Sequence, residues 1–167
     1  MSTIEIRSAS TADVREIRRL VDAYAGDGPR LLRKSMVTLY EDVQEFWVAV
    51  DGVRVIGCGA LHVLWEDLAE VRTLAVDPSQ QRTGVGSMLL RALLDRARAL
   101  GVKRVFCLTF ATAFFGRHGF VEIDGTPVEP SVYDQLLESY DEGVAEFLDL
   151  EWVKPNTLGN HRMLLVL

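Results

Sequence analysis

The sequence has few of the residues that define several common protein classes. It contains only 2 cysteines and 3 histidines among its 167 residues. Cys58 and Cys107 both lie inside apolar runs, so we expect two buried, reduced thiols rather than a disulfide framework. His62, His118 and His161 are far apart along the chain, and no metal site is predicted.

Basic residues are also in the minority. The chain carries 18 Lys and Arg against 24 Asp and Glu, a formal net charge of −6. This balance argues against a broad surface for nucleic acid or for an anionic membrane, although it leaves room for a local basic pocket. No apolar run approaches the roughly 20 residues that span a bilayer, and residues 1–10 lack the apolar segment of a signal peptide. We expect a cytoplasmic protein with no nucleic-acid and no membrane partner.

The length and the order of the expected elements predict a single α/β domain over residues 1–167. With 49% hydrophobic residues, the composition is that of an ordinary globular protein that can bury a substantial core. Alternating or apolar runs predict strands at 4–7, 46–50, 54–63, 70–76, 105–109 and 120–123, and edge strands at 145–153 and 162–167. Helical spacing predicts helices at 14–24, 30–44, 85–100, 113–117 and 131–140.

The most informative segment, residues 71–90, runs from an expected strand through a glycine-rich turn into an expected helix. In Gln81-x-x-Gly84-x-Gly86, missing Cβ atoms leave room for backbone N–H groups to converge, and the helix N-terminus adds partial positive charge. This pattern suits an anion such as a phosphate. The plainer alternative is a tight loop that binds nothing.

Two well-known phosphate-binding motifs do not fit this turn. Gly86 is followed by Ser87 and Met88, whereas a Walker A loop needs Lys and then Ser or Thr at these positions. Leu89 stands where a dinucleotide fingerprint needs a third small residue. Nucleoside-triphosphate and dinucleotide chemistry are therefore disfavoured.

A second motif gives the turn a family context. Residues 114–120 read Phe-Phe-Gly-Arg-His-Gly-Phe, and with Gln81-x-x-Gly84-x-Gly86 they resemble two signatures of the GCN5-related N-acetyltransferase (GNAT) superfamily. The resemblance implies a mixed, mostly antiparallel sheet of about seven strands, flanked by helices and splayed between its fourth and fifth strands. It also implies acetyl-CoA as cosubstrate, with the pantetheine arm between the splayed strands and the pyrophosphate on the turn.

The same resemblance assigns acetyl-CoA to the fourth strand, the turn and the aromatic pair. These residues are Leu74, Ala75, Val76, Gln81, Arg82, Thr83, Gly84, Val85, Gly86, Ser87, Phe114 and Phe115. Splayed strands leave backbone groups unpaired, which the amides of pantetheine can satisfy. Phe115 stands where many relatives carry a tyrosine that protonates the CoA thiolate. The general acid is thus unassigned, with Thr112, Tyr140 and Cys107 as candidates.

Within the superfamily, the chain is most similar to the acetyltransferase domain of N-acetylglutamate synthases, in the short actinobacterial form that lacks an amino-acid-kinase domain. The likeness lies at residues 31–35, 46–49, 70–78, 105–109 and 162–164. It implies direct transfer of acetyl to the α-amino group of glutamate or glutamine, the first step of arginine biosynthesis. Two alternatives stay open: transfer to another primary amine, such as a polyamine, a drug or a protein N-terminus, and a non-catalytic acyl-CoA-binding regulatory module.

Acetyl transfer to an amine needs a base, an oxyanion donor and, for an acidic acceptor, cations. By the resemblance, Glu70 is the general base, and the backbone N–H of Leu74 or its neighbour is the oxyanion donor. An exposed strand-end carboxylate is the plain alternative for Glu70. Arg72 would share the face of Glu70 if the strand alternates regularly. The candidate carboxylate-binding cations are Arg33, Lys34, Arg72, Lys154 and Arg162, with Arg33 preferred.

The C-terminal part of the chain carries less information. Residues 141–160 are longer than we would expect from those synthases, and they are candidates for an acceptor lid, a dimer edge or an elaborated loop. A homodimer therefore stays open.

Overall fold

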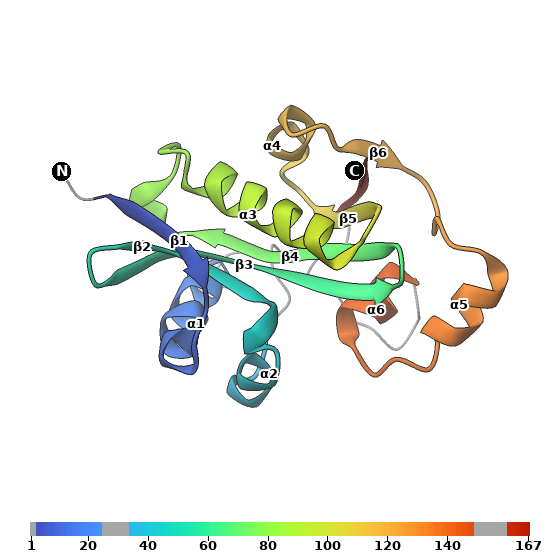
Figure 1. Cartoon of the computed structure of the whole chain (residues 1–167), viewed down its shortest axis with the longest axis horizontal. Coiled ribbons are helices and arrows are strands. Elements are labelled where there is room, and N and C mark those ends of the chain that lie inside the picture. The colour runs from blue at the N-terminus through green and yellow to red at the C-terminus, as the bar shows by residue number, and fades with distance from the viewer. Residues whose placement is uncertain (1–2, 25–33, 149–159) are drawn as a thin grey trace.

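The computed structural model describes residues 3–24, 34–148 and 160–167. Figure 1 shows a single sheet with helices on both sides. The strands are β1 (Ile4–Ser8), β2 (Phe46–Asp51), β3 (Arg54–Trp65), β4 (Leu68–Val76), β5 (Arg104–Thr109), β6 (Val121–Ile123) and β7 (His161–Val166). The helices are α1 (Val14–Asp22), α2 (Met36–Glu41), α3 (Val85–Leu100), α4 (Thr112–Arg117), α5 (Pro130–Leu136) and α6 (Glu142–Phe147). Single 3-10 turns lie at Thr11–Asp13, Val43–Glu45 and Pro78–Gln80.

The seven strands form one sheet in the order β1-β2-β3-β4-β5-β7-β6. Every neighbouring pair is antiparallel except β4 and β5, which run parallel. That parallel pairing extends only from Leu68 opposite Arg104 to Glu70 opposite Phe106. Beyond Glu70 no pairing joins the two strands, so their carboxyl ends are splayed. The predicted fold class and the predicted gap between the fourth and fifth strands are confirmed.

Helix α3 covers one side of the sheet and begins within the glycine-rich turn. Leu89, Leu90 and Leu93 are fully buried against the strands, and each such leucine contributes about 1.5–3 kcal/mol of transfer free energy. Gly84 and Gly101 bound the helix with φ of 89° and 86°, a backbone region that L side chains rarely adopt. Figure 1 places α3 and α4 on one side of the sheet and α1, α2 and α6 on the other.

A bulge in β4 breaks the regular alternation of the strand. The register with β3 moves from Cys58 opposite Ala75 to Ala60 opposite Arg72, so β4 has one extra residue here. Thr73, inside the bulge, has a positive φ of 56°, which is uncommon for a β-branched residue. Because of the extra residue, Leu74 packs on the α3 side of the sheet together with Val71. The bulge thus reverses which face of the sheet the odd- and even-numbered side chains of β4 project from.

The second helix is shorter than the predicted range of 30–44. Residues 30–33 lie outside the described part of the chain, and α2 begins only at Met36. Its start is fixed by Ser35, whose Oγ accepts the backbone N–H of Thr38 at 3.2 Å, as an N-cap residue does. After α2 the chain makes a separate 3-10 turn at Val43–Glu45 instead of continuing as a helix. The predicted helix at 131–140 likewise ends early, at Leu136.

Two predictions for the C-terminal segment are wrong. The predicted edge strand at 145–153 contains the end of α6, because Asp141 caps a helix there by accepting the N–H of Val144 at 3.0 Å. Phe147 then stacks on Phe106 at a centroid distance of 4.1 Å, which buries the helix against β5. Residues 149–153 lie outside the described part. The last strand exists, as β7, but it is an inner strand between β5 and β6.

Candidate active site

The turn after β4 is held in place by a buried carboxylate. Asp77 is only 4% exposed. Its Oδ1 accepts both the N–H and the hydroxyl of Ser79, and its Oδ2 accepts Arg19 at 3.1 Å and Arg54 at 2.8 Å. The hydrogen bonds from Ser79, aided by the two arginines, lower the pKa of Asp77 to about 2. The strand end is therefore locked before the glycines begin.

A cleft of about 1150 Å³ opens where β4 and β5 part. Ten of the twelve residues predicted to bind acetyl-CoA line it: Leu74, Val76, Gln81, Arg82, Gly84, Val85, Gly86, Ser87, Phe114 and Phe115. Ala75 faces the α1 side of the sheet instead, and Thr83 is exposed beside the cleft with its hydroxyl bound to the carbonyl of Gln80. The walls thus come from β4, the turn, α3, β5 and α4.

Several side-chain contacts at this cleft lack a sequence signal. Tyr24, just beyond the end of α1, donates its hydroxyl to the carbonyl of Val76 and accepts the amide of Gln81 at 3.0 Å. Ser87, in the first turn of α3, pairs with His118 at 2.9 Å. Burial, with help from nearby arginines, lowers the pKa of His118. These contacts join segments far apart in sequence, so no local pattern indicated them.

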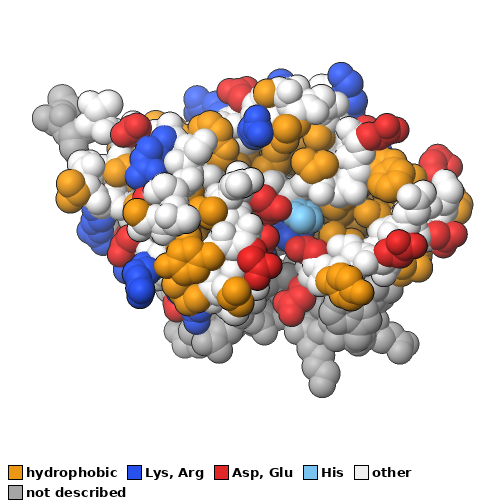
Figure 2. All heavy atoms as spheres, turned by 60° about the horizontal axis from the view of Figure 1, so that its bottom comes forward, with side chains coloured by type: hydrophobic (Ala, Val, Ile, Leu, Met, Phe, Trp, Pro, Cys, Tyr) orange, Lys and Arg blue, Asp and Glu red, His pale blue; other side chains and the backbone are white. Residues whose placement is uncertain are grey.

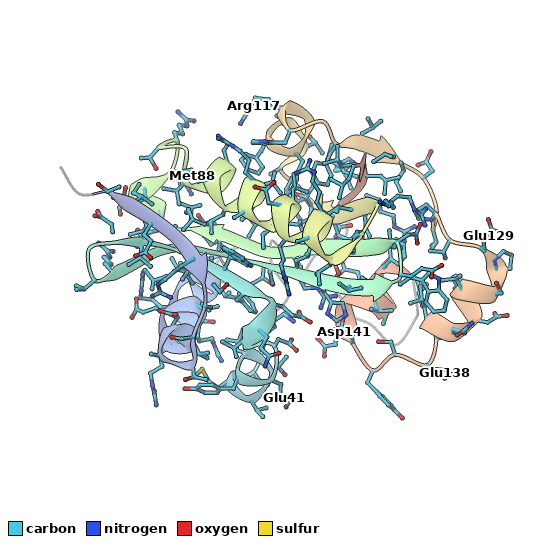
Figure 3. All side chains as sticks on the ribbon, in the orientation of Figure 1. Glu41, Met88, Arg117, Glu129, Glu138 and Asp141 are labelled. Atoms are coloured by element: carbon cyan, nitrogen blue, oxygen red, sulfur yellow. The ribbon has the colours of Figure 1, made fainter. Side chains whose placement is uncertain are left out.

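The mouth of the cleft is basic although the protein is acidic. Arg82 and Arg117 both line it, and Arg117 lies over the ring of Phe114 with 5.9 Å between its guanidinium carbon and the ring centroid. Figure 3 shows Arg117 and Asp141 on opposite sides of the sheet. Cations at the glycine turn suit a phosphate-bearing ligand on the α3 and α4 side.

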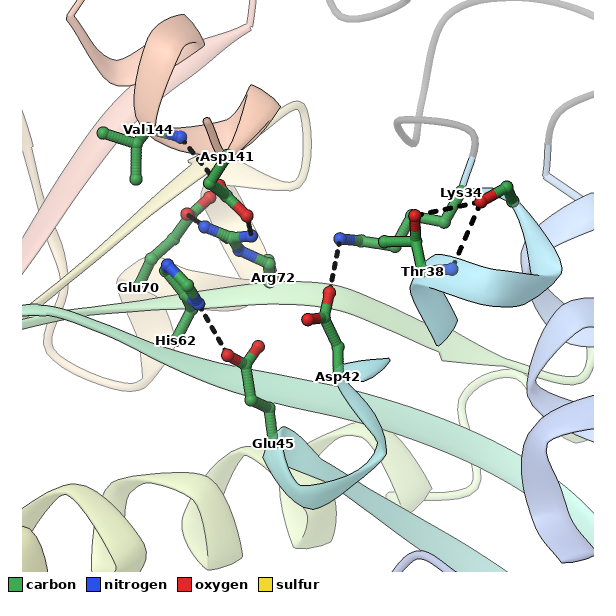
Figure 4. A network of polar contacts seen from close by, with 10 residues as sticks. Lys34, Thr38, Asp42, Glu45, His62, Glu70, Arg72, Asp141 and Val144 are labelled. Carbon is green, nitrogen blue, oxygen red and sulfur yellow. Dashed lines mark hydrogen bonds and ion pairs between the residues drawn. The ribbon is translucent and has the colours of Figure 1, made fainter. Parts of the chain in front are cut away.

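A buried ion-pair cluster lies on the other side of β4. Arg72 donates Nε at 3.0 Å and Nη2 at 2.7 Å to Oε2 of Glu70, and Nη1 at 2.9 Å to Asp141 (Figure 4). Arg72 and Glu70 share one face, as the strand alternation predicts. Burial alone would lower the pKa of Arg72, but the two carboxylates raise it above its usual range. At Asp141, burial alone would raise the pKa, but the hydrogen bond and the charge of Arg72 outweigh it. The pKa of Asp141 is therefore well below its ordinary value.

Arg72 connects the two sides of the sheet, because it lines the cleft while its guanidinium holds Glu70. Glu70 is 4% exposed and does not line the cleft. The bulge at Thr73 follows immediately, and Thr73 and Leu74 both line the cleft. Strand β4 therefore presents the fixed carboxylate of Glu70 on one side of the sheet. On the other side it presents backbone groups at the gap between β4 and β5.

The remaining predicted site residues lie elsewhere or outside the described residues. Lys34 is ion-paired with Asp42 at 3.5 Å on the α2 side. Arg162 lies on β7, in register with Leu108 and Ile123, and does not line the cleft. Thr112 begins α4 and is not a lining residue either. Arg33 and Lys154 fall outside the described part of the chain.

The two thiols and Tyr140 offer little acid chemistry. Both cysteines are free and buried, and burial raises the pKa of Cys58 to about 12. Cys107 lines the cleft, where burial, with a contribution from Glu70, raises its pKa further. Such a thiol stays protonated and is a poor nucleophile. Tyr140 is 99% exposed and does not line the cleft.

Comparison with known proteins places this geometry in a family. The acetyltransferase (GNAT) family profile matches residues 14–120, which include the turn, α3 and the aromatic pair. The chain belongs to this family. It is an N-acetyltransferase by that membership, as the two sequence motifs predict.

A sequence comparison and a structure comparison illustrate its place within the family. The chain is 59% identical over 165 residues to an amino-acid acetyltransferase of Mycobacterium tuberculosis, covering 97% of this chain and 94% of that protein. The crystal structure of Rv2747 from Mycobacterium tuberculosis in complex with CoA and NLQ matches with a TM-score of 0.93, 58% identity and coverage of 98% and 99% of the two chains.

A longer enzyme shares the domain. N-acetylglutamate synthase from Neisseria gonorrhoeae, complexed with coenzyme A and N-acetyl-glutamate, matches with a TM-score of 0.78 and 25% identity, covering 100% of this chain but 36% of that one.

Within residues 3–24, 34–148 and 160–167, no helix is long and apolar enough to cross a membrane. The same residues contain no group of three or more His, Cys, Asp or Glu side chains placed to hold a metal ion.

Proposed function

We propose that the protein transfers the acetyl group of acetyl-CoA to the α-amino group of L-glutamate or L-glutamine. The observation that carries this proposal is the near-full-length identity of 59% to an amino-acid acetyltransferase. The similar structure with CoA and NLQ, and the synthase with coenzyme A and N-acetyl-glutamate, support the same reaction. This activity would make the protein the first enzyme of arginine biosynthesis, acting in the cytoplasm.

The donor half of the reaction is assigned to the cleft. The backbone N–H groups from Arg82 to Ser87 hold the pyrophosphate, with the guanidiniums of Arg82 and Arg117 at hand. The pantetheine arm runs between β4 and β5, where the strands leave their backbone groups unpaired. The thioester then lies near Leu74, whose backbone N–H is the assigned oxyanion donor.

The acceptor half is assigned to the side of β4 that carries Glu70. The amino group loses a proton to Glu70, directly or through one water, and its lone pair attacks the thioester carbon. The C–N bond forms, the C–S bond breaks, and CoA leaves as a thiolate that takes up a proton. Overall the acceptor ammonium yields two protons, one to the thiolate and one to solvent.

Arg72 acts in this scheme as a positioning residue. Its guanidinium is already bound to Glu70 and Asp141, so it fixes the base rather than the acceptor. Another cation of the predicted set therefore binds the carboxylate of the acceptor, and Arg33 is the preferred candidate. The donor of the thiolate proton stays open, because Phe115 replaces the tyrosine of many relatives and Thr112 lies outside the cleft lining.

Release of CoA thiol, followed with a thiol-reactive dye across the amino acids and simple amines, tests the proposal. We expect turnover with glutamate or glutamine that exceeds turnover with aspartate, a polyamine or a peptide N-terminus. Turnover only with another amine would contradict the substrate assignment. Tight acetyl-CoA binding in calorimetry with no turnover on any amine would indicate a regulatory acyl-CoA-binding module.

A further inference from the structure

A second ionisable pair lies beside the ion-pair cluster on the acceptor side. His62, on β3, is directly opposite Glu70 in the register of β3 and β4. Directly opposite residues project from the same face of a sheet and have Cβ atoms about 4.5–5.5 Å apart. The imidazole Nδ1 of His62 is 2.7 Å from Oε1 of Glu45, which ends the 3-10 turn after α2. Figure 4 shows this pair next to Glu70, Arg72 and Asp141.

The contact with Glu45 fixes how the imidazole can exchange protons. A carboxylate can only accept a hydrogen bond, so Nδ1 of His62 is the donor. The lone pair of the neutral ring is then on Nε2, for which the described residues supply no hydrogen-bond partner. A neutral imidazole held by a carboxylate in this way is a base whose free nitrogen is aimed by its partner.

Glu45 carries an independent sign of an absent partner. Its second oxygen, Oε2, is buried and has no hydrogen-bond partner among the described residues. A buried acceptor left unsatisfied costs about 1–3 kcal/mol, so such an atom indicates a place for a water or a ligand donor. The side chains of His62 and Glu45 are 20% and 25% exposed, so both remain partly accessible to solvent.

The charged groups around His62 come from four elements. Glu70 and Arg72 face it from β4, Glu45 from the turn after α2, and Asp141 from the cap of α6. The Lys34–Asp42 pair lies on the α2 side of the same region (Figure 4). Figure 2, turned toward this side, shows acidic side chains and a histidine gathered around a hollow. The surroundings are predominantly acidic, which stabilises a cationic guest such as an ammonium or an imidazolium.

Glu70 by itself is poorly placed to pass a proton to water. It is 4% exposed, and Oε2 is occupied by two donors of Arg72. The reaction must nevertheless deliver one proton per turnover from the acceptor ammonium to solvent. His62 lies directly across the strand pair and is more exposed than Glu70. Imidazole is also the side chain whose ordinary titration falls between pH 5 and 8.

We propose that His62, oriented by Glu45, is the proton relay of the acceptor site. This inference rests on the acetyl transfer proposed above. The proton that leaves the acceptor ammonium for Glu70 passes to Nε2 of His62, which becomes an imidazolium, and His62 then releases it to solvent. The N–H bond of the acceptor breaks, an N–H bond on His62 forms and breaks again, and no other co-reactant is consumed.

The test compares the pH dependence of kcat/KM in wild type, His62→Gln and His62→Ala. We expect His62→Gln to lower kcat about 100-fold at neutral pH, at the lower end of the range of general acid–base effects, while leaving acetyl-CoA affinity unchanged. Wild type should lose activity as the pH falls through the neutral range, and His62→Gln should lack this inflection. Added imidazole should restore turnover to His62→Ala, which a purely structural role would not allow.

The chain offers a matched control on its far edge. His161 makes the same kind of contact, from Nδ1 to Glu122 at 2.6 Å, but between β7 and β6. His161→Gln should keep the wild-type rate, the pH profile and the absence of an imidazole response. Glu45→Gln should lower kcat less than His62→Gln, because the imidazole remains but loses its fixed orientation.

The outcomes separate this inference from the proposed function. If wild type does not acetylate glutamate or glutamine, the proposed function fails. If wild type turns over and His62→Gln keeps the neutral-range inflection, the relay is overturned while the function stands. Loss of activity in His62→Ala without imidazole rescue also contradicts the relay, provided that thermal unfolding shows the variant to be folded.

Discussion

The donor cleft and the acceptor side differ in how the chain builds them. The cleft is formed largely by one continuous stretch, in which β4, the turn at Arg82 to Ser87 and α3 follow one another directly. The acceptor side joins residues from four separate elements: Glu45, His62, Glu70 with Arg72, and Asp141. The first is shaped mainly by local backbone geometry, with Asp77 and its arginine partners holding the strand end. The second is held by side-chain charges that meet only in the folded protein.

This difference predicts separable effects of substitution. Changes in the turn should alter acetyl-CoA affinity, because its backbone shape makes the site. Changes in the charged cluster should alter turnover, because the proposed mechanism uses its side chains to place and move the proton. The two sides share only β4 and Arg72.

The largest effect should come from Glu70→Gln. We expect kcat to fall about 10²- to 10⁴-fold at neutral pH, because an amide cannot accept the proton of the acceptor ammonium. Acetyl-CoA affinity, measured by calorimetry, should change less than about twofold, since Glu70 does not line the cleft. A wild-type rate in this variant would remove Glu70 from the mechanism.

Gly84→Ala should instead weaken the binding of acetyl-CoA in the cleft. The φ of Gly84 is 89°, so a Cβ strains the turn and costs about 1 kcal/mol. We expect acetyl-CoA binding in calorimetry to weaken about tenfold, a change of about 1.4 kcal/mol. Gly101→Ala is the matched control, because Gly101 has a φ of 86° at the other end of the same helix. It should lower stability similarly and leave affinity unchanged; equal losses of affinity in both variants would contradict the role of the turn.

A smaller effect is expected for Asp141→Asn. Asparagine still caps α6, but it removes the negative charge that Arg72 binds at 2.9 Å. We expect kcat to fall about three- to tenfold, because Arg72 then positions Glu70 less well, and stability to fall by about 1–2 kcal/mol. Steady-state kinetics and urea unfolding measure the two effects. An unchanged kcat with a lower stability would reduce Asp141 to a structural residue.

The free energy of unfolding should fall in acid and stay constant near neutral pH. Asp13 is bound by Arg7 and Ser10, and its pKa, like that of Asp77, is lowered from 3.8 to about 2. Carboxylates with depressed folded-state pKa values contribute stability above the unfolded value, and this is lost as the pH falls from about 4 to about 2. Allowing for the partial exposure of their arginine partners, we expect about 1 kcal/mol from each.

Urea unfolding measured between pH 7 and pH 2 checks this expectation. Asp77→Asn should show a flatter decline over the same range, because the proton that Asp77 takes up no longer contributes. A decline of equal steepness in Asp77→Asn and wild type would contradict the assignment of this acid sensitivity to Asp77.

The sequence predicted the geometry of the cleft well because its determinants are largely local. Gly84 and Gly101 punctuate α3 as expected, and the turn lines the cleft. Tyr24 was not foreseen as a cleft residue, because its contact with Gln81 spans 57 positions. The apolar stretch at 145–153 was misread as a strand, because the helix that its first residues form depends on the cap at Asp141 and on the stacking of Phe147 on Phe106.

The acceptor side was predicted only in part for the same reason. Strand alternation placed Arg72 on the face of Glu70, but it could not supply Asp141, which comes from a helix 69 residues later. His62 and Glu45 had no recognisable spacing, and their pairing follows from the register of β3 with β4 and from the turn after α2. A pairing of this kind is set by the fold rather than by local sequence.

The central claim is that one fixed strand, β4, serves both sides of an acetyl transfer to an amino acid. The most direct test is CoA-thiol release by the wild-type protein with acetyl-CoA and each amino acid in turn, with the acetylated product identified by mass spectrometry. We predict Nα-acetylated glutamate or glutamine as the preferred product, formed in step with CoA. Saturable acetyl-CoA binding with no acetylation of either amino acid would contradict the claim.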